Sequence, residues 1–204
     1  EKKPDRFHVL FSRQIEERFP ADRDIRGRVH AYGRRIFRAL CVHVGVKRLT
    51  QALALIEPNQ RPQVLHQSGA RQIEALRASY AQAGVEAELT PFIEDTASAY
   101  AQADLVICRA GASTVTELAA VGAAAIFVPF PHAVDDHQTH NARFLTQRDA
   151  GWLWPQHELD PQALAQRLRE LDRQTLQRVA SQAHACRQTD AVASMVQACA
   201  EVAA

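Results

Sequence analysis

The chain of 204 residues is 47% hydrophobic and 23% charged, which is typical of a folded protein and excludes a disordered or collagen-like chain. At about 150 residues per domain, this length predicts one domain, or one domain with an attached segment. No apolar run reaches the roughly 18 residues that a membrane-spanning helix needs. The net charge of +1 conceals an asymmetry, because residues 1–50 carry 13 Lys and Arg against 6 Asp and Glu, whereas residues 51–204 carry 11 against 17.

Residues 1–62 read as an atypical basic N-terminal segment of uncertain order. Residues 27–49 are rich in Arg and β-branched side chains but follow neither the period of a strand nor that of a helix. The basic excess is compatible with phosphate groups or an anionic membrane surface, although a solvated surface explains such charge more often. No RNA- or DNA-binding motif accompanies it, so we predict no nucleic-acid partner. The chain begins with Glu1 rather than Met, which suggests a piece of a longer protein.

From residue 63 to residue 204, short apolar segments alternate with helical ones. The predicted strands cover 63–68, 85–92, 104–109, 124–130 and 152–154, and the predicted helices cover 71–82, 95–103, 113–121 and 137–148, with further helices to the C-terminus. This alternation is typical of βαβ units, which form a parallel sheet with helices on both faces. The predicted fold class is therefore α/β, with a Rossmann-like parallel sheet.

Four cysteines, Cys41, Cys108, Cys186 and Cys199, lie far apart and form no C-x-x-C pair. No secretory leader precedes them, so free and mostly buried thiols in a cytoplasmic protein are predicted.

The segment 108–118 follows a predicted buried strand with a turn at Gly111 and then a helix. In a parallel α/β sheet, ligands bind at the carboxyl ends of the strands against helix N-termini. The amide groups of Ala112, Ser113 and Thr114 would there face an anion such as a diphosphate, with Glu117 one turn further on to accept hydrogen bonds from a ribose diol. The alternative is a capping box formed by Thr114 and Glu117, which needs no ligand.

The segment 129–142 also follows a predicted strand, and it gathers amide, imidazole and carboxylate groups. The cluster can hydrogen-bond sugar hydroxyls through Asp135, Asp136, His137, Gln138, His140 and Asn141. A helix capped by Asp, with His side chains facing solvent, is the simpler explanation. A metal site is the weaker alternative, with His132, Asp135, His137 and His140 as its candidate ligands. A third loop follows the strand 85–92, where Phe92 and Ile93 are placed to flank a nucleobase while backbone groups read its edge; core packing is the other explanation.

Three motifs, at 66–69, 92–122 and 127–142, resemble the MurG family of bacterial glycosyltransferases in order and spacing. That family adds N-acetylglucosamine from UDP-N-acetylglucosamine to the lipid-linked muramoyl-pentapeptide precursor of peptidoglycan. The resemblance implies a GT-B fold of two Rossmann-like domains, of which residues 63–204 correspond to the C-terminal, donor-binding half. It also implies an inverting reaction without a cofactor or metal, in a cytoplasmic enzyme that sits peripherally on the inner membrane.

By resemblance, each motif residue acquires a role. Phe92 and Ile93 match the family's uracil-contacting pair, and Glu117 matches its ribose-binding carboxylate. The family's diphosphate-facing turn corresponds to Gly111, Ala112, Ser113 and Thr114. Its sugar-contacting motif corresponds to His137, Gln138 and Asn141.

Residues 27–50 depart from the family pattern. The family's donor domain opens with a strand that ends in a G-G-S-x-G-A loop, and this chain has an Arg- and His-rich stretch there instead. A local frameshift or real divergence would each produce it, so we expect the first strand region to be altered. The catalytic residues are expected in the family's N-terminal domain, which this chain does not contain. A UDP-sugar-binding or epimerase-like protein of the same fold, or a non-catalytic remnant, remains an alternative.

Overall fold

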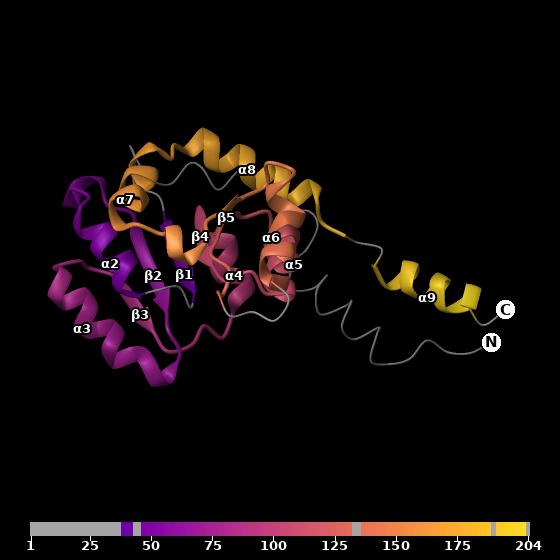
Figure 1. Ribbon diagram of the computed structural model, residues 1–204, viewed down its shortest axis with the longest axis horizontal. Helices are drawn as coiled ribbons and strands as arrows, with labels where there is room; N and C mark the ends of the chain where they lie inside the picture. Colours follow the sequence, from indigo (N-terminus) through magenta and orange to yellow (C-terminus); the bar gives the residue numbers. More distant parts are fainter. Residues whose placement is uncertain (1–37, 43–45, 132–135, 189–190, 203–204) are drawn as a thin grey trace.

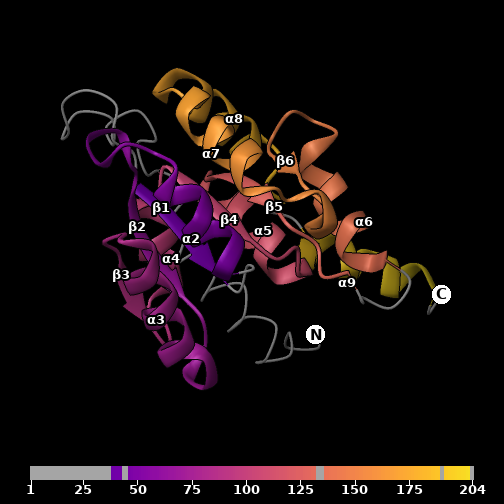
Figure 2. The ribbon, with the colours of Figure 1, turned by 60° about the vertical axis from the view of Figure 1, so that its left-hand side comes forward.

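The computed structural model describes residues 38–42, 46–131, 136–188 and 191–202. Within them, six strands form one parallel sheet in the order β3-β2-β1-β4-β5-β6, which Figure 2 shows side by side. Their bounds are β1 Arg38–Val42, β2 Gln63–Gln67, β3 Glu88–Thr90, β4 Leu105–Cys108, β5 Ala124–Phe127 and β6 Trp152–Leu153. The order reverses between β1 and β4, which is the position where open α/β sheets bind ligands at the carboxyl ends of their strands.

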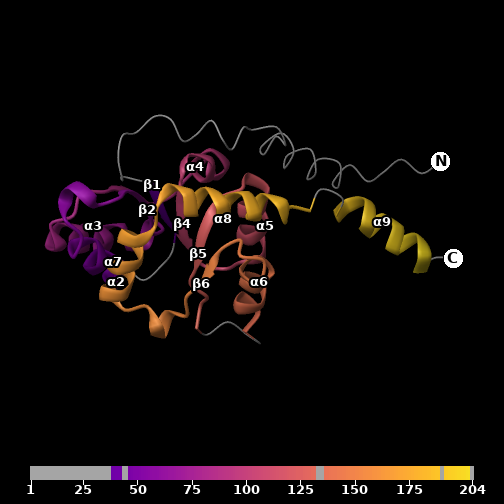
Figure 3. The same ribbon diagram turned by 90° about the horizontal axis from the view of Figure 1, so that it is seen from above.

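Helices cover both faces of the sheet, as Figure 1 shows. They are α2 Val46–Ala54, α3 Ile73–Ala83, α4 Thr96–Gln102, α5 Ala112–Val121, α6 His137–Thr146, α7 Pro161–Glu170, α8 Arg173–Ala185 and α9 Ala191–Val202. Side chains of α2, α3 and α7 bury one face, and those of α4, α5 and α6 bury the other. Figure 3 shows α8 crossing over the sheet and α9 lying apart from it.

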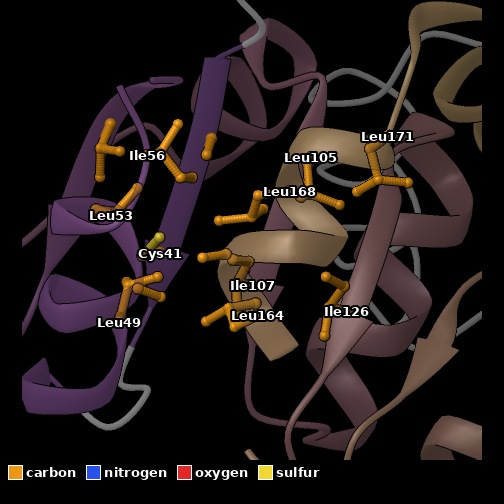
Figure 4. Packing of buried hydrophobic residues seen from close by; sticks show 14 of the residues in the cluster. Cys41, Leu49, Leu53, Ile56, Leu105, Ile107, Ile126, Leu164, Leu168 and Leu171 are labelled. Atoms are coloured by element: carbon orange, nitrogen blue, oxygen red, sulfur yellow. The ribbon is translucent and has the colours of Figure 1, made fainter. Parts of the chain in front are cut away.

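Alternate residues of each strand contribute to the two buried clusters. Cys41, Ile107 and Ile126 point to the face that α2 and α7 cover, and Figure 4 shows Leu49 and Leu164 converging on them. Their neighbours in the chain, including Leu40, Val106 and Phe127, belong to the opposite cluster. Apolar strands without alternation are thus explained by burial on both faces, as expected for a parallel sheet.

The α/β class and the parallel sheet predicted from the sequence are confirmed. The strands predicted at 63–68, 104–109, 124–130 and 152–154 correspond to β2, β4, β5 and β6, and each predicted helix is present. The strand predicted at 85–92 is shorter, because only Glu88–Thr90 pairs with β2 at this edge of the sheet.

The main difference from the sequence analysis is strand β1. Residues 27–50 gave no strand signal, yet Arg38–Val42 lies in the middle of the sheet, with Leu40 opposite Leu65 of β2 and Val106 of β4. Helix α2 follows it, and both elements share the cores of the later ones. The division that we placed between residues 62 and 63 therefore does not follow the sheet. Residues 1–37 of the basic segment and the loop 43–45 lie outside the described residues.

The cysteines are free thiols, as predicted. Cys41 and Cys108 are buried, Cys186 is half-buried and Cys199 is exposed. Burial raises the pKa of Cys108 to about 12. Burial, followed by the neighbouring Cys108, also raises the pKa of Cys41 well above its usual range. The two buried thiols therefore serve as core side chains rather than as nucleophiles. Among the described residues, no helix has the length and apolar character to span a membrane.

Candidate functional site

The loops predicted to carry chemistry lie at one edge of the molecule. They follow β3, β4 and β5, and because all strands are parallel, their carboxyl ends open on the same side of the sheet. The loops after β2 and β6 reach that edge as well. The arrangement brings the predicted nucleobase, diphosphate and sugar positions to one side of the domain.

The turn from β4 to α5 leaves the start of the helix open to an anion. Gly111 is the N-cap of α5, with φ −64° and ψ 150°, and it has no side chain that could accept from the first helical amides. A Cβ built on Gly111 would meet only the Thr114 hydroxyl, at 3.7 Å. The amides of Ala112 and Ser113 at this helix start are therefore placed as an anion site requires.

The capping-box alternative is wrong. The helix begins at Ala112, so Thr114 is its third residue and not its N-cap. Instead, a hydrogen bond joins the side chains of Thr114 and Tyr100 of α4. Burial, then Cys108 and Glu117, raise the pKa of Tyr100 far above its usual range, whereas the bond to Thr114 lowers it. Glu117 is half-buried one turn into α5, and it lies close enough to Tyr100 for its negative charge to raise the pKa of the Tyr100 hydroxyl.

Gln138 is held in a defined orientation beside the loop after β5. The backbone N–H of Phe130 donates to Oε1 of Gln138 at 2.8 Å. Because the carbonyl oxygen is engaged there, the amide nitrogen of Gln138 presents its N–H donors on the other side. His137, the first residue of α6, is exposed next to it.

Asn141 is tied to the protein itself. Its Nδ2 donates to the carbonyl oxygen of Ala110 at 3.1 Å, which joins α6 to the turn before α5. Asn141 thereby links the helix that carries the predicted sugar-contacting residues to the turn that carries the predicted diphosphate position.

The loop after β3 presents Phe92 with 67% of its surface exposed, as an unburied aromatic at the edge of the site. The Thr90 hydroxyl donates to the carbonyl oxygen of Phe92 at 2.7 Å and so closes a tight turn. The N–H of Ile93 donates to Oε1 of Gln67 at 3.2 Å, while the Ile93 side chain packs on the core. Gln67, at the end of β2, is buried, and sequence reasoning missed its part in shaping this loop.

Arg109, directly after β4, was also missed. It is half-buried, and its guanidinium donates to the carbonyl oxygens of Val128 and Pro129, each at 3.0 Å. A second nitrogen donates to Oε1 of Gln156 at 2.6 Å, and the group lies 5.4 Å from the centre of the Phe130 ring. Burial lowers the pKa of Arg109. A charged residue directly after a buried strand was the signal that could have drawn attention to it.

The metal alternative has no support in the part of the chain that the structure describes. No three His, Cys, Asp or Glu side chains there form a group that could hold an ion. His137 and His140 are exposed on α6, and His132 and Asp135 lie outside the described residues.

Comparison with known proteins identifies relatives of the whole sheet. A protein-family model described as "Glycosyltransferase family 28 C-terminal domain" matches residues 40–198. A relative from Verminephrobacter eiseniae, named UDP-N-acetylglucosamine--N-acetylmuramyl-(pentapeptide) pyrophosphoryl-undecaprenol N-acetylglucosamine transferase, is 64% identical over 154 residues, which are 76% of this chain and 43% of the relative. A relative of the same name from Polaromonas sp. is 60% identical over 164 residues, 78% of this chain and 42% of the relative. The chain thus spans less than half the length of these curated relatives.

Solved structures show the same fold. The crystal structure of MurG from Acinetobacter baumannii matches with a TM-score of 0.70 and 41% identity, over 81% of this chain and 51% of the other. The glycosyltransferase VinC, solved with dTDP, matches with a TM-score of 0.55 at 16% identity, over 81% of this chain and 42% of VinC, which shows a shared fold alone.

Proposed function

The chain belongs to the glycosyltransferase family 28 C-terminal domains, and on this premise we propose that it binds UDP-N-acetylglucosamine at the carboxyl edge of its sheet. It would act as the donor-binding half of a transferase that moves N-acetylglucosamine to a lipid-linked muramoyl-pentapeptide. The names of relatives 60–64% identical to this chain support the reaction and both substrates. We take the donor-binding domain to begin with β1 rather than at residue 63, since the family model starts at residue 40.

The observation that carries the proposal is the turn from β4 to α5. Its Gly111 N-cap leaves the helix start open where the sheet order reverses, which suits a diphosphate. Glu117 lies one turn deeper, where its carboxylate would accept from the ribose hydroxyls. Phe92 and Ile93 would flank the uracil, and Gln138, with His137, would contact the sugar.

This chain would contribute to the reaction mainly by holding the leaving group. When an acceptor hydroxyl attacks the anomeric carbon, the bond to the diphosphate breaks and negative charge grows on the departing UDP. The amides at the start of α5 and the helix dipole are placed to stabilise that charge. The group that takes the proton from the acceptor hydroxyl would come from the half of the protein that this chain does not contain.

The chemistry of the acceptor supports a location at the membrane for the complete protein. The relatives' names specify a pyrophosphoryl-undecaprenol carrier, whose polyisoprenoid chain resides in a lipid bilayer. We therefore infer that the complete protein works peripherally at the cytoplasmic face of the membrane. Co-sedimentation of the complete protein with vesicles that contain the acceptor lipid would test this; recovery entirely in the supernatant would contradict it.

Calorimetric titration of the 204-residue chain with UDP-N-acetylglucosamine, and separately with UDP, tests the donor site directly. We expect saturable binding of both, with tighter binding of the sugar nucleotide. If a cooperatively folded chain binds neither, the motifs are inherited but the site is broken, and the chain is a non-catalytic remnant.

Gln138→Glu should remove the preference for the sugar nucleotide. The new carboxylate still accepts from the Phe130 N–H, but an oxygen replaces the N–H donors that would contact the sugar. We expect UDP-N-acetylglucosamine to lose about 1–2 kcal/mol of affinity relative to UDP. His140→Ala, on the same helix, serves as control, because His140 is exposed and has no role in the proposed site. Equal losses for both ligands would contradict the assignment of Gln138 to the sugar.

A further inference from the structure

We propose that Arg109 and Gln156 form a clamp that positions the loops after β4 and β5 for donor binding. The pair is called the Arg109–Gln156 clamp below. The inference rests on the proposed function and adds to it two positioning residues, neither of which was among the site residues predicted from the sequence.

Arg109 fixes the course of the loop after β5. Two consecutive carbonyl oxygens, those of Val128 and Pro129, accept from the same guanidinium nitrogen at 3.0 Å each. The guanidinium also lies 5.4 Å from the centre of the Phe130 ring, on the next residue along the loop. Three successive residues of the loop are therefore held against the residue that directly follows β4. The same loop carries the Phe130 N–H that orients Gln138.

Gln156 anchors Arg109 on a third loop, between β6 and α7. Its side-chain oxygen accepts from Arg109 at 2.6 Å, while its backbone oxygen accepts from the guanidinium of Arg48 on α2. The same Arg48 nitrogen also donates to the carbonyl oxygen of Leu159 at 3.3 Å. The clamp thus connects the loops after β4, β5 and β6 with the helix that follows β1.

The geometry favours positioning over direct contact with the diphosphate. Arg109 is half-buried, and its guanidinium donates hydrogen bonds to three acceptors of the protein. A guanidinium committed in this way would have to give up these acceptors to reach a ligand, leaving two backbone carbonyls of the loop unpaired. Its contribution to the donor site therefore passes through Phe130 and Gln138.

The test compares Arg109→Ala, Gln156→Ala and the double variant with Arg148→Ala as matched control. Arg148 likewise stacks on a phenylalanine, Phe144 at 4.9 Å, and donates to a backbone carbonyl, but it is exposed and its acceptor lies four residues away in the same helical segment. Two quantities are measured for each chain. One is amide hydrogen exchange in residues 109–112 and 127–131 without ligand, and the other is the ratio of UDP-N-acetylglucosamine affinity to UDP affinity.

We expect both single clamp variants to speed exchange in these segments and to lower the affinity ratio roughly threefold to tenfold, with the double variant little worse than either single one. Arg148→Ala should change neither quantity. Loss of the affinity ratio is the decisive readout, because general destabilisation would weaken both ligands alike.

Three outcomes would overturn the clamp. Unchanged exchange and an unchanged ratio in Gln156→Ala would show that Gln156 positions nothing. Equal loss of both ligands in Arg109→Ala would show that Arg109 does not act through the sugar-contacting Gln138, and additive effects in the double variant would show that the two residues act separately. If the parent chain binds neither nucleotide, the proposed function fails. The clamp can still be tested in that case, because the exchange measurement needs no ligand, and unaltered exchange in both single variants would reject the clamp.

Discussion

Leu40→Ala should lower the free energy of unfolding by about 2–5 kcal/mol, as for other large-to-small substitutions in packed cores. Leu40 is 1% exposed and lies in the centre of the sheet, between Leu65 of β2 and Val106 of β4. Its side chain belongs to the cluster that α4 and α5 cover. A cavity at this position has neighbours on every side and little room to collapse. Urea unfolding followed by circular dichroism measures the change.

Leu55→Ala is the matched control for this substitution. Leu55 lies directly after α2 and has 47% of its surface exposed, so we expect a change below about 1 kcal/mol. If both substitutions had equally small effects, β1 would not be the central strand. The donor site would then lose the strand next to its diphosphate turn, because β1 and β4 flank the position where the sheet order reverses.

The sequence predicts most of the sheet but not β1, and the reason is physical. Arg38–Val42 is five residues long, follows an Arg-rich stretch and is buried on both faces, so it shows no alternation that would set it apart. Its place is decided by pairing with β2 and β4, which are distant in the sequence. Strands β4 and β5 were found because clear helices and turns bound them.

The candidate site shows the same distinction between local and long-range information. The turn at Gly111 and the helix after it were predicted from adjacent residues, although the helix begins earlier than the capping-box alternative required. By contrast, Arg109 bonds to Gln156 across 47 residues, and Gln67 bonds to the Ile93 amide across 26. No pattern of adjacent residues predicts such contacts. Gln67 and Arg109 lie within the motifs 66–69 and 92–122, but the way they shape the loops depends on partners that are distant in the sequence.

Glu117→Ala should weaken UDP binding by about 1–3 kcal/mol, the usual loss when a buried hydrogen-bond partner is removed. Glu117 is half-buried in α5, one turn beyond the open helix start, and close to the buried Tyr100 of α4. A carboxylate in this position has two oxygens for the two hydroxyls of a ribose. Glu117→Gln, which keeps one acceptor oxygen, should lose less affinity than the alanine variant. Calorimetric titration with UDP measures both.

A second ligand separates a ribose contact from a general effect on the site. 2′-Deoxyuridine diphosphate lacks one of the two hydroxyls, so it should bind the parent chain less tightly than UDP does and should lose less than UDP when Glu117 is replaced. Glu74→Ala, an exposed carboxylate on α3, should alter neither affinity. Equal losses for UDP and its deoxy analogue in Glu117→Ala would assign Glu117 to the structure of α5 rather than to the ribose. In that case the nucleoside would be held chiefly by the loop of Phe92 and Ile93, and the specificity of the donor site would rest on the loops after β3 and β5.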